Sequence, residues 1–378
     1  MNWVALKMLT GNRGKYIGII GGIMFASLLI AQQASIFCGL MLLTTSQIKD
    51  IEGAELWIMD PNVQFIDDIK PLSENDLYRV RGVEGVDWAV RLYKGLTRAR
   101  LQNGNFQQMI LIGLDDATLV GAPRHMLLGN LADLRKPDAI IIDKDGFEQL
   151  WPGEPLSIGK RFEMNDREAE VVGVCKARRT FQTFPVVFTR YSQAVAFAPR
   201  ERKVLSFVLA NPEPGVSAEE VCRRIKAQTG LQARTRDEFS MQTIDYFLRK
   251  TGIPINFFIT VLLGFIVGTA IAGQTFYLFT LENLKQFGAL KAMGATNFKL
   301  MQMIVLQASL VGFIGYGLGV GLAAIFGELT KTTSKLAFYM HPYVLVGTGL
   351  AVVFIAIISS LLSMRRVIVL EPAVVFQG

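Results

Sequence analysis

The sequence predicts an α-helical membrane protein with four transmembrane helices and a large mixed α/β extracytoplasmic domain between helices 1 and 2. Three observations lead to this fold class. Hydrophobic residues make up 51% of the chain, and they are concentrated in four stretches without Asp, Glu, Lys or Arg. Basic residues gather in the short segments beside these stretches. Residues 46–250, in contrast, alternate short apolar runs with polar, capped segments.

Four uncharged stretches each exceed the length that a spanning helix requires. They are 33, 31, 28 and 29 residues long: Tyr16–Ile48, Thr251–Leu281, Leu300–Gly327 and Leu336–Met364. A spanning helix needs about 20 mostly apolar residues, and one central charge costs about 2.5–3.5 kcal/mol. Buried core helices of a soluble protein are the alternative, but such helices rarely stay uncharged for so long. We therefore expect transmembrane helices over 16–45, 251–281, 300–327 and 342–364.

The first stretch also has the basic flank of a secretory signal peptide, formed by Lys7, Arg13 and Lys15. A signal h-region, however, is about 7–15 residues long, and the apolar run Tyr16–Leu43 is nearly twice that. We interpret the stretch as an anchor that is not removed. Residues 1–15 are expected to form a cytoplasmic interfacial helix.

Charge predicts the orientation of the chain. Residues 46–250 hold 29 basic and 29 acidic residues, whereas 1–15, 282–299 and 365–378 together hold eight Lys and Arg against two acids. Short cytoplasmic loops are enriched in Lys and Arg. We therefore place both termini and the 282–299 segment in the cytoplasm, with residues 46–250 and a short 328–341 loop in the periplasm. The net charge of +7 then reflects membrane topology and contact with lipid, and gives no support to nucleic-acid binding.

The periplasmic domain, residues 46–250, reads as α/β. Ser73 and Ser217 each precede an amphipathic segment with an acid three residues on, which is typical of a helix N-terminus. This repetition indicates two similar halves flanking a β-rich insert at about 95–200. Six runs of β-branched and aromatic residues predict strands: 54–60, 86–93, 107–115, 139–143, 169–176 and 204–210.

One segment of the insert, "CKARRTFQTFPVVFTRY" (175–191), interleaves arginines with aromatic residues. It has two interpretations. It is either a loop that contacts a partner, or a β-hairpin with its aromatic residues inside and its arginines in water. The candidate contact residues are Arg178, Arg179, Phe181 and Phe184.

Glycines recur at four-residue spacing inside the predicted spans. In lipid, small residues at this spacing let helix backbones approach closely. We expect the helices to form a packed bundle or a dimer through these positions: Gly264, Gly268, Gly315 and Gly319. No acid or base lies in any span, which argues against a secondary transporter or a channel.

Sequence signatures of catalysis are missing. The chain has no G-x-x-x-x-G-K-[ST], no G-x-S-x-G and no H-E-x-x-H, and its two histidines are isolated. We expect no catalytic activity, cofactor or metal in this chain. The spacing of Cys175 and Cys222 leaves open whether they form a disulfide.

The segment "TLENLKQFGALKAMGATNFKL" (280–300) is too polar to span the membrane. By composition alone it is a cytosolic turn with interfacial helical ends. Its motif, however, resembles the signature of the MacB/FtsX-type (type VII) permeases of ABC transporters, roughly E-x-G-x-L-[KR]-A-[LIM]-G-A. The run from Gly288 to Ala295 matches it at seven positions. Gln286 stands where many members have Glu, and the nearest acid is Glu282, six residues before Gly288. The sequence of this segment is especially similar to that of the DevC-like branch.

The resemblance implies a function for 282–299. In this family the corresponding helix docks on a separate ATPase subunit, which binds ATP and Mg²⁺. A cytoplasmic coupling helix is therefore expected here, with these coupling residues: Glu282, Lys285, Phe287, Gly288, Leu290, Lys291, Met293 and Gly294.

The resemblance further implies the permease subunit of an ABC exporter in the bacterial inner membrane. Two copies would work with two ATPase subunits, a periplasmic membrane-fusion adaptor and a TolC-like outer-membrane protein. ATP-driven motion would reach the periplasmic domain and drive export of an amphiphile such as a glycolipid, drug or peptide. The alternatives are an FtsX-like regulator of a cell-wall hydrolase, a lipoprotein-release permease, and a membrane-anchored sensor without an ATPase.

Overall fold

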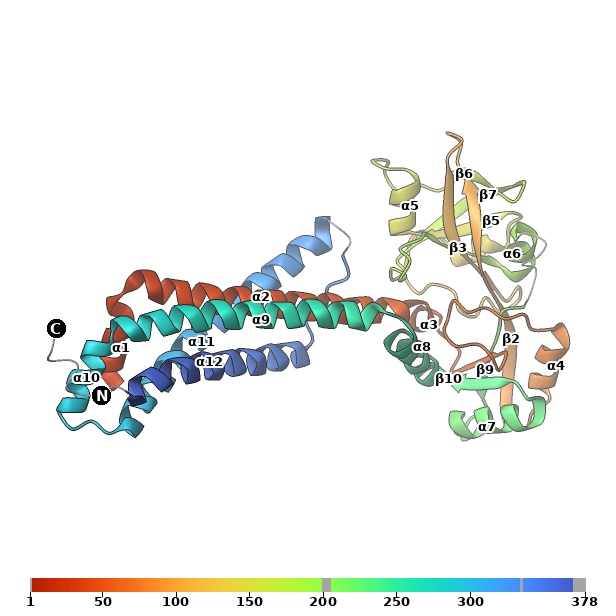
Figure 1. The fold of residues 1–378 in the computed structure, drawn as a ribbon. Helices are drawn as coiled ribbons and strands as arrows, with labels where there is room; N and C mark the ends of the chain where they lie inside the picture. The colour runs from red at the N-terminus through yellow and green to blue at the C-terminus, as the bar shows by residue number, and fades with distance from the viewer. Residues whose placement is uncertain (1, 199–204, 334–335, 370–378) are drawn as a thin grey trace. The chain divides into compact units, whose positions relative to one another are not determined.

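The computed structural model describes residues 2–198, 205–333 and 336–369, and the chain forms two compact units (Figure 1). One unit, Met41–Thr251, is the mixed α/β domain. The other combines Met1–Leu40 with Gly252–Gly378, and its regular elements in the described residues are all helices. The predicted fold class is therefore confirmed. The predicted tail, 365–378, lies outside the described residues from position 370 onward.

The helical unit contains four helices that are long and apolar enough to cross a membrane. The helix that carries the third of them continues beyond 327, the predicted end of that span. The unit consists of α1 (Asn2–Gly11), α2 (Arg13–Thr44), α9 (Ile253–Glu282), α10 (Leu284–Ala292), α11 (Asn297–Thr333) and α12 (Pro342–Val369).

Helix α1 packs against α11. Ala5 and Leu9 are fully buried in the hydrophobic cluster of the helical unit, and Gln307 Nε2 of α11 donates a hydrogen bond of 2.8 Å to the Ala5 carbonyl. Trp3 stays 70% exposed, with the Lys7 ammonium 5.4 Å from its ring centre. The helix thus has one face on the bundle and an aromatic residue left for the membrane surface.

Glycines bring the long helices together within this unit. An added methyl group at Gly268 would overlap Ala26 of α2, and one at Gly315 would lie 2.8 Å from Ile23 Cβ of the same helix. Small residues allow such close approach in lipid. All four glycines predicted for helix packing meet α2 in this way: Gly264, Gly268, Gly315 and Gly319. They serve packing inside one chain, and their use between two copies stays a prediction.

The connection before α12 also sits directly on α2. A methyl group at Gly39 would lie 2.7 Å from the Ala337 carbonyl carbon, so only glycine fits there. The Tyr339 amide donates a 3.0 Å hydrogen bond to the carbonyl of Ser35, inside α2. The contact joins backbone to backbone.

The α/β domain is built on a ten-stranded sheet in the order β10-β1-β9-β2-β3-β8-β5-β7-β4, with β6 pairing with β2 and β7. All six predicted strands overlap observed ones. The sheet consists of β1 (Leu56–Met59), β2 (Val86–Arg100), β3 (Phe106–Leu114), β4 (Met126–Gly129), β5 (Ala139–Asp143), β6 (Arg161–Met164), β7 (Arg167–Cys175), β8 (Val186–Arg190), β9 (Phe207–Pro212) and β10 (Gln232–Thr235).

Alternating side chains of the strands feed two hydrophobic clusters, one on each face of the sheet. Ile58 of β1 belongs to one cluster and its neighbour Trp57 to the other. The Ile58 face is covered by α4 (Glu74–Arg81) and α7 (Ala218–Thr229). The Trp57 face receives α3 (Ser46–Asp50) and α8 (Arg236–Lys250), and Trp57 lies 5.5 Å from Phe239 of α8.

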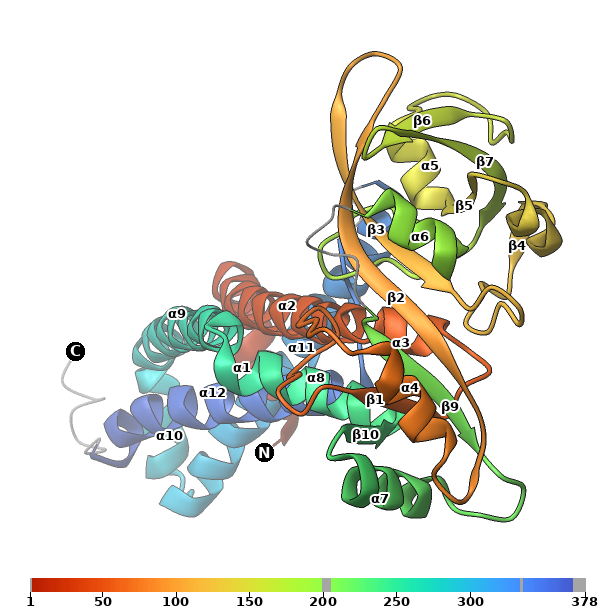
Figure 2. The same ribbon diagram turned by 90° about the vertical axis from the view of Figure 1, so that its right-hand side faces the viewer.

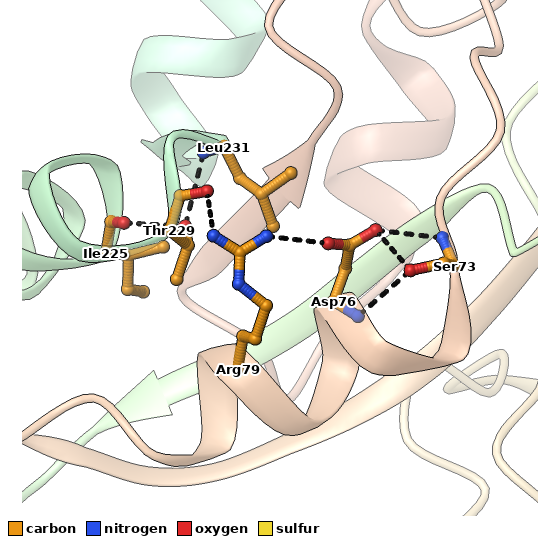
Figure 3. Close-up of polar contacts among 6 residues, drawn as sticks. All are labelled: Ser73, Asp76, Arg79, Ile225, Thr229 and Leu231. Carbon is orange, nitrogen blue, oxygen red and sulfur yellow. Dashed lines mark hydrogen bonds and ion pairs between the residues drawn. The ribbon is translucent and has the colours of Figure 1, made fainter.

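Two capped helices link the halves of the domain (Figure 3). Ser73 and Asp76 form a reciprocal capping box at the start of α4, as the sequence predicts. Arg79 donates to Asp76 at 3.1 Å and to the carbonyl of Thr229, at the end of α7, at 2.5 Å. The β1-α4-β2 and β9-α7-β10 segments are thereby fastened together, and β1 and β2 both pair with β9.

The strands β1, β9 and β10 with the first half of β2, and the helices that cover them, form the base of the domain. A β-rich insert extends from this base. Strand β2 pairs with β9 through its first half and with β3 through its second half, so it runs from the base into the insert (Figure 2). Three short helical segments complete the insert: η1 (Leu131–Arg135), α5 (Lys144–Leu150) and α6 (Tyr191–Phe197).

The hairpin interpretation of 175–191 is wrong. Strands β7 and β8 do not pair with each other, because β5 lies between them in the sheet. Residues 176–185 form a loop that crosses from one to the other.

Candidate functional site: the helix between the second and third spans

Helix α10 begins where Asn283 ends α9. The Asn283 amide and side-chain Nδ2 both donate to the Phe279 carbonyl, at 3.2 and 2.8 Å. A side chain that bonds to the preceding turn competes with the helical hydrogen-bond pattern. The chain turns there, and the Asn283 carbonyl accepts the first hydrogen bond of α10, from the Phe287 amide at 3.0 Å.

A Schellman motif with Gly294 as its left-handed residue follows the last helical residue of α10, Ala292. The Ala295 amide donates to the Leu290 carbonyl and the Gly294 amide to the Lys291 carbonyl, each at 3.0 Å. These are the two bonds that define the motif, and it places a left-handed residue at Gly294, where φ is +91°. The glycine of the predicted motif is therefore needed for backbone conformation. No atom lies within 4 Å of an added methyl group there.

One face of α10 is fixed to the membrane bundle. Phe287 is fully buried in the cluster that includes Phe279 and Met303. Gly288 is also buried, and Leu290 packs partly against the same cluster. These three predicted coupling residues thus hold the helix on the spans and do not face outward.

Two further predicted residues are engaged inside the chain. Glu282 forms an ion pair with Lys15 and accepts a 3.1 Å hydrogen bond from Asn12 Nδ2, so it fastens the start of α2 to the end of α9. Lys291 Nζ donates at 3.1 Å to the Ile368 carbonyl near the end of α12. An ammonium group at a helix C-terminus is favourable because the last carbonyls are unpaired. Both charges tie α10 and its flanks to the bundle.

The outward surface of this segment is apolar with a basic margin. Met293 is 75% exposed and Phe298, at the start of α11, is 66% exposed. Lys285 and Lys299 are also exposed. The sequence prediction named Met293 and Lys285 but missed Phe298. The feature that could have indicated Phe298 is a large aromatic residue in a polar segment outside the uncharged stretches.

This arrangement is suited to protein docking. A rigid helix with two exposed apolar side chains between ammonium groups fits an apolar groove with an acidic rim. In the part of the chain that the structure describes, no group of three His, Cys, Asp or Glu side chains could hold a metal ion.

The four residues predicted for adaptor contact lie in the loop between β7 and β8. Arg178 pairs with Asp50, Arg179 with Asp145, and Phe181 packs against Phe247. Phe184 is partly buried against the Trp57-side cluster. The structure brings all four into contacts within the domain, and their role toward an adaptor stays a prediction.

The two cysteines of this domain do not form a disulfide. Both thiols are free and buried, Cys175 on the Trp57 side of the sheet and Cys222 on the Ile58 side. Burial raises the pKa of the Cys222 thiol to about 12 and that of Cys175 well above its ordinary value. Burial and a raised pKa are typical of structural cysteines.

Comparison with known families identifies the class of protein. A family model described as MacB-like periplasmic core domain matches residues 17–228, and one described as FtsX-like permease C-terminal matches residues 254–372. The first match alone covers more than half of the chain. The chain therefore belongs to the MacB/FtsX-type family of ABC transporter permeases. Its assignment to the DevC-like branch stays a prediction.

Two individual relatives and one solved structure are similar to this chain. An uncharacterized ABC transporter permease of Mycobacterium tuberculosis is 24% identical over 319 residues, which cover 82% of this chain and 80% of that protein. HrtB of Staphylococcus epidermidis, named as a candidate hemin transport system permease, is 26% identical over 145 residues, 38% of this chain and 39% of that protein. The solved periplasmic region of MacB from Actinobacillus actinomycetemcomitans has a TM-score of 0.38 and 15% identity, covering 54% of this chain and 96% of that chain.

Proposed function

We propose that this permease transmits ATP-driven motion from a separate ATPase to its periplasmic domain, and that the ATPase docks on α10 and the start of α11. The supporting observation is the division of labour along 282–299. Phe287 and Leu290 hold the helix on the spans, whereas Met293 and Phe298 stand out from it. Because the helix is held on the spans, a force applied to Met293 and Phe298 would be transmitted to α9, α11 and α12.

The proposed assembly contains two copies of this chain and two ATPase subunits, which hold ATP and Mg²⁺. A periplasmic adaptor and a TolC-like outer-membrane tunnel complete it, and an amphiphile is the cargo. Hemin, which appears in the name of the Staphylococcus epidermidis relative HrtB, belongs to this class of cargo. The periplasmic unit, Met41–Thr251, is large enough for both cargo and adaptor contacts, which favours an exporter over a regulator with a small outer domain.

The docking surface is tested by placing a carboxylate on it. We expect Met293→Asp and Phe298→Asp each to weaken ATPase binding about thirtyfold, because truncating a central interface anchor costs about 2 kcal/mol or more. The measurement is ATPase recovery with the C-terminally tagged permease after gentle solubilisation. Leu290→Asp is a poor test, because Leu290 packs on the bundle and its loss would disturb the fold.

Phe106→Asp is the matched control. Phe106 is as exposed as Phe298, at 66%, but it lies at the start of β3 in the periplasmic domain. ATPase recovery that is equal for all three variants and the unsubstituted protein would contradict the docking proposal.

The proteins that co-purify also separate the alternatives. An ATPase with a periplasmic adaptor supports the exporter. An ATPase with a cell-wall hydrolase supports the FtsX-like regulator, and an ATPase with neither supports lipoprotein release. Recovery of no ATPase, under conditions that preserve related complexes, supports the sensor.

A further inference from the structure

A groove of about 580 Å³ runs between α11 and α12, the helices that carry the last two candidate spans. Its volume lies in the range of about 300–1,000 Å³ that small-ligand pockets occupy. The lining extends over Val305–Tyr316 on α11 and Leu345–Met364 on α12, which at 1.5 Å per residue are about 17 and 29 Å long. One leaflet of the hydrocarbon core is about 15 Å thick. The groove is therefore long enough for an acyl chain that lies along it.

Two glycines in the lining keep the groove open. A methyl group added at Gly312 would lie 3.7 Å from Val352 Cγ1 and 3.8 Å from Ala356 Cβ, and one added at Gly349 would lie 3.7 Å from Tyr316. These are ordinary contact distances, in contrast to those at the glycines packed on α2. Close approach of α11 and α12 therefore does not require glycine here, and larger side chains at these positions would fill the groove.

One end of the groove is bridged by a side chain. The Tyr316 hydroxyl donates to the Leu345 carbonyl at 3.2 Å, so this side chain crosses from α11 to α12. On α11 the lining ends at Tyr316. The opposite end, at Val305 and Met364, is the one nearer to α10 along α11. Because the charge distribution places α10 in the cytoplasm, a chain enters the groove from the cytoplasmic leaflet.

The rims of the groove are apolar and exposed. Phe313 of α11 is 77% exposed, and Val353 and Ile357 of α12 are exposed as well. Spread over the length of the groove, its volume gives a mean cross-section of about 20–35 Å², whereas an α-helix about 10 Å wide has about 80 Å². The groove is too narrow for a helix of a second copy or of another protein. Lipid tails are as apolar as this lining, and a single hydrocarbon chain suits its width.

The cytoplasmic end of the groove is basic. Lys299, near the start of α11, is exposed, and among the described residues no carboxylate pairs with it. The sequence places Arg365 and Arg366 toward the matching end of α12. Helix α12 contains no Asp or Glu, and α11 has none before Glu328. Basic residues between spans on the cytoplasmic side attract anionic lipid headgroups.

We propose that the groove between α11 and α12 binds one acyl chain of an anionic phospholipid from the cytoplasmic leaflet. The chain lies along α11 past Gly312 toward Tyr316, and the headgroup phosphate lies at the basic end of the groove, near Lys299. The apolar lining selects the chain, and the ammonium group selects the charge of the headgroup. Neither ATPase docking nor export enters the argument, so the site stands independently of the proposed function.

Native mass spectrometry of the full-length protein tests this site. The protein is purified in a mild detergent, stripped of lipid, and titrated with phosphatidylglycerol or with phosphatidylcholine that carries the same chains. We expect one phosphatidylglycerol molecule to bind at least fivefold more tightly than phosphatidylcholine, because one basic residue near the headgroup favours an anionic lipid about fivefold.

Two substitutions fill the groove, one from each helix. Gly312→Leu and Gly349→Leu should abolish binding of both lipids. Gly317→Leu is the matched control, since Gly317 also belongs to α11 but lies outside the lining and has open space around it. Thermal unfolding checks that each variant is folded, and if one of the filling variants is not, the other decides.

A charge substitution tests the headgroup separately and leaves the apolar lining intact. Lys299→Gln should lower the affinity for phosphatidylglycerol about fivefold and leave that for phosphatidylcholine unchanged. Lys285→Gln, at an exposed position of α10, is its control and should change neither affinity.

Three results would overturn the proposal. The first is phosphatidylglycerol binding that is equal in the filling variants and in Gly317→Leu. The second is equal affinity for the two lipids, or an affinity for phosphatidylglycerol that Lys299→Gln does not change. The third is a protein dimer that Gly312→Leu or Gly349→Leu dissociates while lipid binding persists, which would assign the groove to a second copy of the chain.

Discussion

At the scale of single residues, Gly294 shows why the motif 288–295 has its particular composition. Its φ of +91° lies in the left-handed region, which costs an L-residue with a side chain about 1 kcal/mol or more. The conformation is what allows Ala295 and Gly294 to donate to the last turn of α10. The glycine thus fixes where α10 stops. It thereby also fixes the position of the exposed Met293 side chain.

We expect Gly294→Ala to loosen the end of α10. A cost of about 1 kcal/mol corresponds to roughly fivefold faster amide exchange of residues 290–295 through local opening. Hydrogen–deuterium exchange on the purified full chain measures it. Gly252→Ala is the control, since Gly252 also has open space around it but a φ of −77°. Equal protection in both variants would contradict this account.

At the scale of elements, α2 is the helix on which α9 and α11 pack through glycine. Gly268 of α9 faces Ala26 so closely that any side chain must displace the helix. Gly317 of α11, by contrast, has no atom within 4 Å of an added methyl group. The two positions therefore form a natural pair for comparison.

We expect Gly268→Val to destabilise the bundle by about 1–3 kcal/mol through overpacking. Gly317→Val should have no comparable effect on one chain. Thermal unfolding of the solubilised protein tests the difference. If Gly317→Val were the more harmful substitution, the exposed glycine would instead be packing against a second copy.

The elements also show what the sequence can and cannot predict. Capped helices and β-branched strands were recognised because their signals are local. Helix α8 was missed although Thr235 and Glu238 form a capping box at its start. Strands β4, β6 and β10 have only four residues each and no distinct pattern. Their pairing depends on neighbours distant in the chain.

At the scale of the whole molecule, the distribution of charge predicts that both termini and α10 are cytoplasmic. We test this with single cysteines at exposed positions. Phe106→Cys should react with a membrane-impermeant maleimide added from the periplasmic side. Met293→Cys should react only after the inner membrane is permeabilised. The opposite pattern would reverse the topology.

The sequence predicted which segment forms the candidate site, but not which of its side chains are exposed. The motif located α10 because it follows a span and ends in glycine, both readable in the chain. Which side of α10 faces outward depends on tertiary packing, so Phe287 and Leu290 proved to be anchors and Phe298 was overlooked. The partners of Glu282 and Lys291 lie far away in sequence, at Lys15 and Ile368. No local pattern indicates such pairs.

The packing of the 336–341 connection on α2 has a mechanical consequence. Gly39 meets the backbone of Ala337, and Ser35 accepts from the Tyr339 amide. Sliding of α2 along its axis past the connection would break this backbone contact, whereas tilting about it would not. We therefore expect the contact to oppose sliding of α2 relative to the 336–341 connection.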